Sequence, residues 1–204
     1  MTTQSEQKPT VFIVDDDAAI RFAMEALMES VNLDHEIFAS ADEFLDKISE
    51  QRPGCLVLDI RMPGLGGLEL QEELIRRGNT LPIIFITGHG DVPMAVEAMQ
   101  KGAVDFIQKP FRDQELLDRI REALATDQHR REEQQQHEEV ANRLDKLTNR
   151  EREVFDLVVT GKPNKVIAYE LGVSQRTVEI HRARVMEKMQ ARSLADLVKM
   201  HMTA

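Results

Sequence analysis

Acidic, hydroxyl and basic side chains follow separate apolar runs of the sequence. They are Asp15 and Asp16 after VFIV, Asp59 after CLVL, Thr87 after IIFI, and Lys109 after DFIQ. Such groups can transfer a phosphoryl group: carboxylates bind a divalent cation, one carboxylate attacks phosphorus, and an ammonium and a hydroxyl contact the phosphoryl oxygens. The residue types therefore predict a phosphoryl-aspartate site.

Five apolar runs alternate with helical patterns over the first 125 residues. They span about 11–14, 35–39, 55–58, 83–87 and 104–108. This alternation predicts a five-stranded parallel, doubly wound, flavodoxin-like α/β domain. The carboxyl ends of its strands should meet along one crevice, where the polar residues would converge. After the fourth run Val92, Ala95, Val96 and Met99 recur at helical spacing, which is typical of a helix with one packed face.

The acidic pair after the first run also has a structural interpretation. Asp favours the N-cap of a helix and interacts well with the helix dipole, so Asp15 and Asp16 taken alone fit a cap as well as a metal site. The polar residues after the other three runs favour the phosphoryl site. Mg²⁺ is the expected cation because it binds carboxylate and carbonyl oxygens and keeps several waters.

Charge is divided unevenly along the 204 residues, whose net charge is -10. From Lys146 onward there are 11 Lys and Arg against 7 Asp and Glu, and before it 15 against 29. An acidic body with a basic tail predicts a regulatory domain joined to a part that contacts nucleic-acid phosphates. No run approaches a membrane span and no signal peptide is evident, so we expect a cytoplasmic protein that makes no membrane contact.

Residues 126–143 are rich in Gln, Glu, Arg and His and lack Gly and Pro, which predicts an extended helix. This helix can be a solvated spacer or a short coiled coil that forms dimers, and its length does not decide between them. The predicted organisation is a disordered N-terminus at 1–9, a first domain at 10–125, a helical linker at 126–143 and a C-terminal domain at 144–204.

The last sixty residues show only helical patterns. Helix starts are expected at Thr148, Pro163, Ser174 and Ser193, and helix ends near Gly161 and Gly172. Thr148 and Glu151 have the spacing of a capping box. The two helices joined by the LGVS turn predict a small all-α helix-turn-helix domain, whose second helix would enter the major groove of DNA.

Side chains of that second helix are candidates for DNA contact, because side chains read bases and charge anchors phosphates. The exposed candidates are Gln175, Arg176, Thr177, Glu179, Ile180, Arg182, Ala183 and Arg184, with Asn164 and Lys165 at the preceding helix start for phosphates. Glu179 can accept from a cytosine amino group. His181 has the phase of the inner face, which favours a packing role. An arginine-rich helix can also be only a solvated face, but the turn and cap around this one favour DNA binding.

The chain resembles the response-regulator receiver family through VDDD, LDIRMPG, ITGHGD and DFIQKPF. Its tail resembles the LuxR-type helix-turn-helix through TNREREV, NKVIAYELGVS and RTVEIHRARVMEKM. Together these motifs are typical of FixJ-like members of the FixJ/NarL family. The resemblance implies a two-component transcription regulator, an activator, that is not an enzyme beyond its own phosphorylation and slow dephosphorylation.

The resemblance also implies a role for each crevice residue. Asp59 would be the phospho-acceptor and Lys109 would contact the phosphoryl group. Asp16 and Asp59 would bind Mg²⁺ together with the backbone carbonyl of Arg61. Asp15 would act mainly through a water molecule on the metal.

Two further features and the partners follow from the resemblance. Thr87 and Phe106 would be coupled switch residues, and the Lys109–Pro110 peptide bond would be cis. The partners would be a sensor histidine kinase, promoter DNA, RNA polymerase and, after phosphorylation, a second copy of the chain.

The Asp15-Asp16-Asp17 run also resembles the haloacid-dehalogenase phosphatases, in which Asp15 would be the nucleophile. That motif continues with Thr or Val where this chain has Ala19. That family also usually inserts a cap domain, whereas this chain continues into a helix-turn-helix. Mutation of Asp59 separates the two hypotheses, because only the receiver requires this residue to capture phosphate.

Overall fold

The structure is a computed structural model that describes residues 8–48, 52–88 and 92–203. The chain divides into two compact units between Arg130 and Arg131. The predicted disordered N-terminus, 1–9, lies almost wholly outside the described residues. In the parts that the structure describes, no helix is both long and apolar enough to cross a membrane.

Five parallel strands form the sheet of the first unit. They are β1 (Thr10–Val14), β2 (His35–Phe38), β3 (Gly54–Asp59), β4 (Ile83–Thr87) and β5 (Asp105–Gln108), in the order β2-β1-β3-β4-β5. The helices between and after them are α1 (Ala18–Ser30), α2 (Ala41–Lys47), α3 (Gly67–Arg76), α4 (Val92–Gln100) and α5 (Asp113–Leu144). This arrangement confirms the predicted flavodoxin-like fold class.

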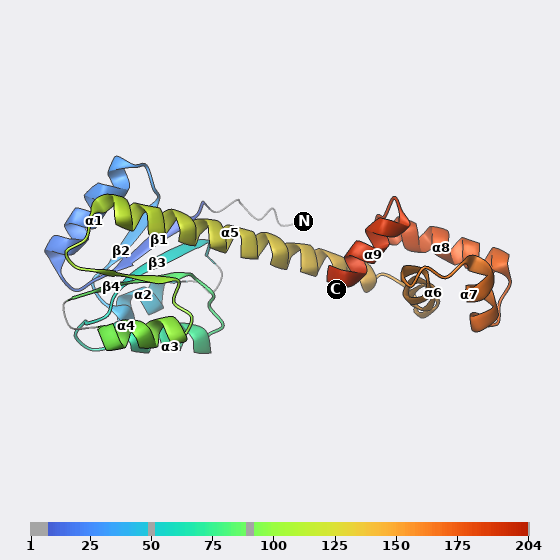
Figure 1. Cartoon of the computed structure of the whole chain (residues 1–204), viewed down its shortest axis with the longest axis horizontal. Helices are drawn as coiled ribbons and strands as arrows, with labels where there is room; N and C mark the ends of the chain where they lie inside the picture. Colours follow the sequence, from blue (N-terminus) through green and yellow to red (C-terminus); the bar gives the residue numbers. More distant parts are fainter. Residues whose placement is uncertain (1–7, 49–51, 89–91, 204) are drawn as a thin grey trace. The chain divides into compact units, whose positions relative to one another are not determined.

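Alternate residues of each strand point to opposite faces of the sheet. Phe12 and Val14 pack on the side of α2, α3 and α4, whereas Val11 and Ile13 pack on the side of α1 and α5 (Figure 1). All four side chains are at most 1% exposed. Burial on both faces explains why the strands read as continuous apolar runs in the sequence.

The strand order changes direction between β1 and β3: the chain places β2 on one side of β1 and then crosses to β3 on the other side. These strands are neighbours, and Val14 pairs with Leu58 at the end of the ladder. The register therefore sets the following residues, Asp15 and Asp59, side by side at the carboxyl edge. In doubly wound sheets such a switch point is where ligands bind.

Helix α4 differs from its predicted packing. Ala95 is fully buried, but Val96 is 48% and Met99 is 38% exposed. The inner face is made by Ala95 and Ala98, whose small side chains let the helix lie close to the sheet. Apolar spacing alone did not distinguish this face from its neighbour, because α4 has apolar residues on several sides.

Helix α5 contains the stretch predicted as a linker. Residues 132–139 are all exposed, and none is apolar, so this part offers no apolar stripe for the seam of a coiled coil, which favours the spacer interpretation. Asp127 differs from the rest of the stretch. It is 2% exposed, and its Oδ2 accepts from the backbone N–H of Gly54 at 2.9 Å, so it packs with the first unit.

The second unit is wholly helical. Its helices after α5 are α6 (Asn149–Val159), α7 (Asn164–Leu171), α8 (Gln175–Met189) and α9 (Leu194–Thr203). Their shared core includes Val154, Phe155, Ile167, Val178, Val185, Met189 and Leu197, together with Val140 and Leu144 from the end of α5. Thr148 caps α6 and Ser174 caps α8, and Gly172 ends α7 at a φ of 65°, a left-handed conformation that suits glycine.

Candidate functional site

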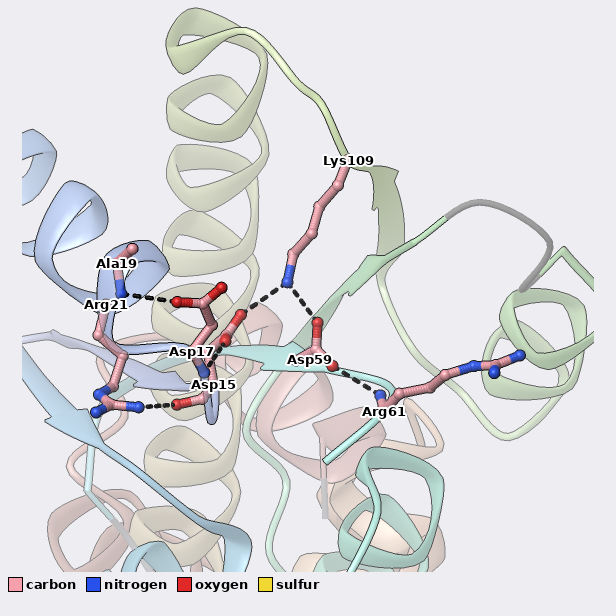
Figure 2. A network of polar contacts seen from close by, with 7 residues as sticks. All are labelled: Asp15, Asp17, Ala19, Arg21, Asp59, Arg61 and Lys109. Carbon is pink, nitrogen blue, oxygen red and sulfur yellow. Dashed lines mark hydrogen bonds and ion pairs between the residues drawn. The ribbon is translucent and has the colours of Figure 1, made fainter. Parts of the chain in front are cut away.

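Lys109 joins the carboxylates at two neighbouring strand ends. Its Nζ donates to Asp15 Oδ2 at 2.9 Å and to Asp59 Oδ1 at 2.6 Å (Figure 2). Asp15 directly follows β1, Asp59 ends β3, and Lys109 directly follows β5. Three polar residues separated by up to 94 positions therefore lie at one place.

Backbone N–H groups hold the second oxygen of each carboxylate. Asp17 N donates to Asp15 Oδ1 at 2.8 Å, and Arg61 N donates to Asp59 Oδ2 at 2.7 Å (Figure 2). Each carboxylate thus has one backbone donor and shares the Lys109 ammonium. Both are fixed in orientation, which a nucleophile and a metal ligand require.

Burial dominates the electrostatics of the crevice. Asp59 is 7% exposed, and burial raises the pKa of its carboxyl, although the hydrogen bond from Lys109 opposes the shift. Burial by itself would lower the pKa of Lys109, but hydrogen bonds to Asp59 and Asp15 outweigh it, so the pKa of Lys109 is raised. Lys109 therefore stays an ammonium at neutral pH.

The donor set fits a hard divalent cation. Asp16 is exposed, and its carboxylate has no hydrogen bond or ion pair among the described residues. Asp15 and Asp59 place two carboxylates around the ammonium of Lys109. Their oxygens, with the Asp16 carboxylate on the same turn and the backbone carbonyl of Arg61 as further oxygen donors, are of the type that Mg²⁺ prefers.

Thr87 lies on β4 and Phe106 on β5, the strand that Lys109 directly follows. Thr87 ends β4 and is 3% exposed, and its carbonyl accepts from Lys109 N at 2.7 Å. Phe106 is 39% exposed on β5, opposite Phe85 of β4. The Lys109–Pro110 bond is cis, as the resemblance implied.

The helix cap proposed as an alternative for the acidic pair belongs to the third aspartate. Asp17 Oδ1 accepts from Ala19 N at 2.8 Å and caps α1 (Figure 2). Asp15 and Asp16 do not cap the helix. Sequence reasoning missed this role, although an Asp directly before an apolar helical pattern was the available signal.

Arg21 is a second residue near the crevice that sequence reasoning missed. Its Nη1 donates to the backbone carbonyl of Asp15 at 2.7 Å (Figure 2). No sequence motif marks such a contact, because it joins a side chain to a backbone atom six positions earlier.

Helices α7 and α8 carry the residues predicted to contact DNA. Most of these residues are exposed, namely Lys165 on α7 and Gln175, Arg176, Glu179, Ile180, Ala183 and Arg184 on α8. Three are half-buried instead, namely Asn164, Thr177 and Arg182.

Packing within the helix pair explains these three differences. Arg182 Nη1 donates to Asn164 Oδ1 at 2.9 Å, which ties α8 to the start of α7. The Thr177 hydroxyl lies 2.8 Å from that of Ser174, at the cap of α8. His181 is half-buried, in agreement with a packing role.

Comparisons with known proteins identify both units. Residues 11–121 match the family "Response regulator receiver domain", and residues 145–201 match "Bacterial regulatory proteins, luxR family". Nodulation protein W of Bradyrhizobium diazoefficiens is 49% identical over 201 residues, 98% of this chain and 88% of that protein. Transcriptional regulatory protein FixJ of Azorhizobium caulinodans is 46% identical over 194 residues, 95% of this chain and 92% of that protein.

A solved structure supports the same assignment. The response regulator StyR is 44% identical and superposes with a TM-score of 0.89 over 97% of this chain and 100% of that one. These matches decide against the phosphatase resemblance of the Asp15-Asp16-Asp17 run. The chain therefore belongs to the FixJ-like response regulators of two-component systems, which are transcription regulators that join a receiver domain to a LuxR-type DNA-binding domain.

Proposed function

We propose that Asp59 accepts a phosphoryl group from the phosphohistidine of a sensor histidine kinase. A carboxylate oxygen of Asp59 attacks phosphorus, the P–N bond breaks, and the imidazole leaves and takes up a proton. The observation that carries this proposal is the shared Lys109 contact, which presents Asp59 beside a second carboxylate at a switch point of the sheet. The chain modifies itself and does not turn over a separate substrate.

The surrounding residues would each hold part of the transferred charge. Asp16, Asp59 and the carbonyl of Arg61 would bind Mg²⁺ directly, and Asp15 would hold water in its hydration shell. The bound cation would offset the negative charge of the incoming group. Lys109 would turn its ammonium to a phosphoryl oxygen, and the Thr87 hydroxyl would donate to another.

Movement of Thr87 toward the phosphoryl group would let Phe106 follow and change the surface of α4, β5 and α5. Apolar side chains are already exposed on α4 and around β5: Val96, Met99, Val104 and Phe106 are each 37–48% exposed. We propose that a second copy of the chain covers this surface after phosphorylation. A dimer presents two helix-turn-helix units to the two half-sites of a promoter.

The downstream part of the proposal concerns transcription. We propose that α8 reads promoter DNA through Gln175, Arg176, Glu179, Ile180 and Arg184, that Lys165 contacts phosphate, and that the bound dimer activates RNA polymerase in the cytoplasm. The proposed boundaries remain 10–125 for the receiver, 126–143 for the linker and 144–204 for the DNA-binding domain.

The phospho-acceptor can be tested by intact mass after incubation with acetyl phosphate and Mg²⁺. We expect a gain of about 80 Da, one phosphoryl group, in the native chain and none in Asp59→Asn, because the amide is not a nucleophile. Asp17→Asn, which changes a neighbouring carboxylate outside the proposed site, serves as the matched control and should still gain the group. A gain that persists in Asp59→Asn and disappears in Asp15→Asn would instead favour the phosphatase-like chemistry.

The proposed dimer can be tested by light scattering of the phosphorylated chain. We expect the mass to double with acetyl phosphate and Mg²⁺. Val96→Glu should remain monomeric while still gaining the phosphoryl group, because a charge would be buried in the interface. Glu97→Gln, on an adjacent position of α4, is the control and should dimerise. An unchanged mass in the fully phosphorylated native chain would contradict the proposal.

A further inference from the structure

The turn between β1 and α1 contains Asp15 and Asp16, which are both proposed to serve the cation. Of these two, only Asp15 has a side chain that is held by hydrogen bonds among the described residues. Asp15 has both carboxylate oxygens engaged, by Asp17 N and by Lys109 Nζ. Asp16 has an exposed carboxylate with no partner among the described residues. The position of Asp16 therefore depends on its backbone.

Arg21 acts on that backbone. Its guanidinium Nη1 donates to the carbonyl oxygen of Asp15 at 2.7 Å (Figure 2). The backbone N–H of Arg21 also donates to Asp17 O at 3.0 Å. The Asp15 carbonyl belongs to the peptide group that ends at the nitrogen of Asp16. Because a peptide group is planar, an anchored carbonyl also fixes the position of the Asp16 Cα atom, from which the carboxylate extends.

The Asp15 carbonyl lies just beyond the end of the β1 ladder. The last residue of β1, Val14, pairs with Phe38 and Leu58, and Asp15 N still donates to Phe38 O at 3.3 Å. Asp15 is 2% exposed, and a buried carbonyl needs a donor. Among the described residues Arg21 supplies that donor from its side chain, and it is the only basic residue of α1.

We infer that Arg21 is a positioning residue for the cation site: through the Asp15 carbonyl it fixes the peptide that orients the Asp16 carboxylate toward the divalent ion. The inference rests on the proposed function, which requires that ion. Arg21 itself does not touch the cation or the phosphoryl group.

Simple electrostatics makes the opposite prediction. A guanidinium close to a dication repels it, so loss of the Arg21 charge would strengthen Mg²⁺ binding. Loss of positioning would weaken it, because residues that orient metal ligands typically contribute 10- to 100-fold to metal affinity. Whether the Mg²⁺ affinity falls or rises in a variant without the Arg21 charge therefore separates a positioning role of Arg21 from a purely electrostatic one.

The test is a Mg²⁺ titration of the ¹⁵N-labelled full chain, followed through the amide signals of Asp17 and Arg61. We expect Arg21→Met to weaken Mg²⁺ binding about tenfold. Arg21→Lys, which keeps the charge and one donor, should recover part of the affinity. Lys47→Met removes an exposed positive charge from α2 and should leave the affinity unchanged.

A second readout does not need the metal. Without Mg²⁺, the Asp17 amide, which donates to Asp15 Oδ1, should exchange with solvent faster in Arg21→Met, while amides of the β3 ladder keep their protection. Equal or tighter Mg²⁺ binding by a folded Arg21→Met, or unchanged exchange at Asp17, would overturn the inference. If the native chain binds no Mg²⁺, the proposed function fails, and the exchange at Asp17 still decides whether Arg21 holds the turn.

Discussion

The two units of the chain use charged side chains in opposite ways. In the receiver, Asp15 and Asp59 are 2% and 7% exposed and converge on Lys109. In the DNA-binding unit, Lys165, Arg176 and Arg184 are exposed on the surface of the helix pair. The first arrangement carries the cost of desolvating its charges and is fixed before any ligand arrives. The second carries little such cost, because its charged side chains remain in water.

This difference concerns function and not only burial. A reaction at phosphorus needs groups that are already aligned, so the fold must hold them. Non-specific attraction to DNA needs only charge near phosphates, and bases are then read by side chains that can adapt. We expect substitutions in the crevice to change the stability of the receiver, and substitutions on the DNA-binding surface to leave stability unchanged.

Lys109→Met should produce the largest effect. It leaves two buried carboxylates facing each other without the shared ammonium, which we expect to lower the free energy of unfolding of the receiver by about 3 kcal/mol at pH 7. Without Lys109 the pKa of Asp59 rises further. The difference in free energy of unfolding between the native chain and the variant should therefore shrink as the pH falls and this carboxyl is protonated. Urea unfolding followed through receiver amide signals measures the change.

Lys47→Met is the matched control for Lys109→Met. Lys47 pairs with Glu43 at 2.8 Å, but its side chain is 61% exposed. Exposed pairs of this kind contribute less than about 1 kcal/mol. Equal losses in the two variants would show that the convergence of charge in the crevice does not matter to stability.

The sequence predicted the crevice because the strand ends follow a geometric rule. Four of the five apolar runs ended at a polar residue, and parallel topology brought Asp15, Asp59 and Lys109 together. Asp127 and Arg21 could not be found in this way. Asp127 is a single acid in a polar stretch, and its partner Gly54 lies 73 positions away. Arg21 binds a backbone carbonyl, which has no sequence signature.

Helical periodicity was a weaker guide than strand ends. On α8 the inner face predicted for His181 is the face that also carries the buried Val178 and Val185, and polar residues mark the opposite face. On α4 the periodicity placed Val96 and Met99 inside, although both are exposed. A helix with apolar side chains on two faces carries two signals, and the period does not tell which face packs on the sheet and which is available to a partner.

Glu151→Gln tests a buried charged residue of the DNA-binding unit, an exception to the contrast between buried charges in the receiver and exposed charges in this unit. Glu151 is 2% exposed in the DNA-binding unit, where its Oε2 accepts from Lys188 Nζ and from Thr148 N. These hydrogen bonds, that of Lys188 above all, lower the pKa of Glu151 to about 2. We expect the neutral variant to lower the free energy of unfolding of this unit by about 2 kcal/mol at pH 7.

The pH dependence of Glu151→Gln has a definite sign. A carboxyl whose pKa is lowered by folding stabilises the fold above its unfolded pKa, about 4.3, and loses that contribution as the pH falls toward 2. The difference between native chain and variant should therefore be constant above about pH 5 and shrink in acid. A difference that does not change with pH would mean that the capping geometry, and not the charge, stabilises this unit. Glu153→Gln, an exposed acid on the same helix, is the control.

Lys165→Ala should have the smallest effect on stability and a specific effect on binding. Lys165 is exposed at the start of α7, so the free energy of unfolding should change by less than about 0.5 kcal/mol. If its ammonium contacts one phosphate, the slope of log affinity against log salt for a duplex of arbitrary sequence should fall by about 1. Lys199→Ala, on α9, removes the same charge away from the helix pair and should leave the slope unchanged. An unchanged slope in Lys165→Ala would place the DNA-binding surface elsewhere, and a large loss of stability would remove the contrast between the two units, because an exposed charge would then support its fold as the buried ones do.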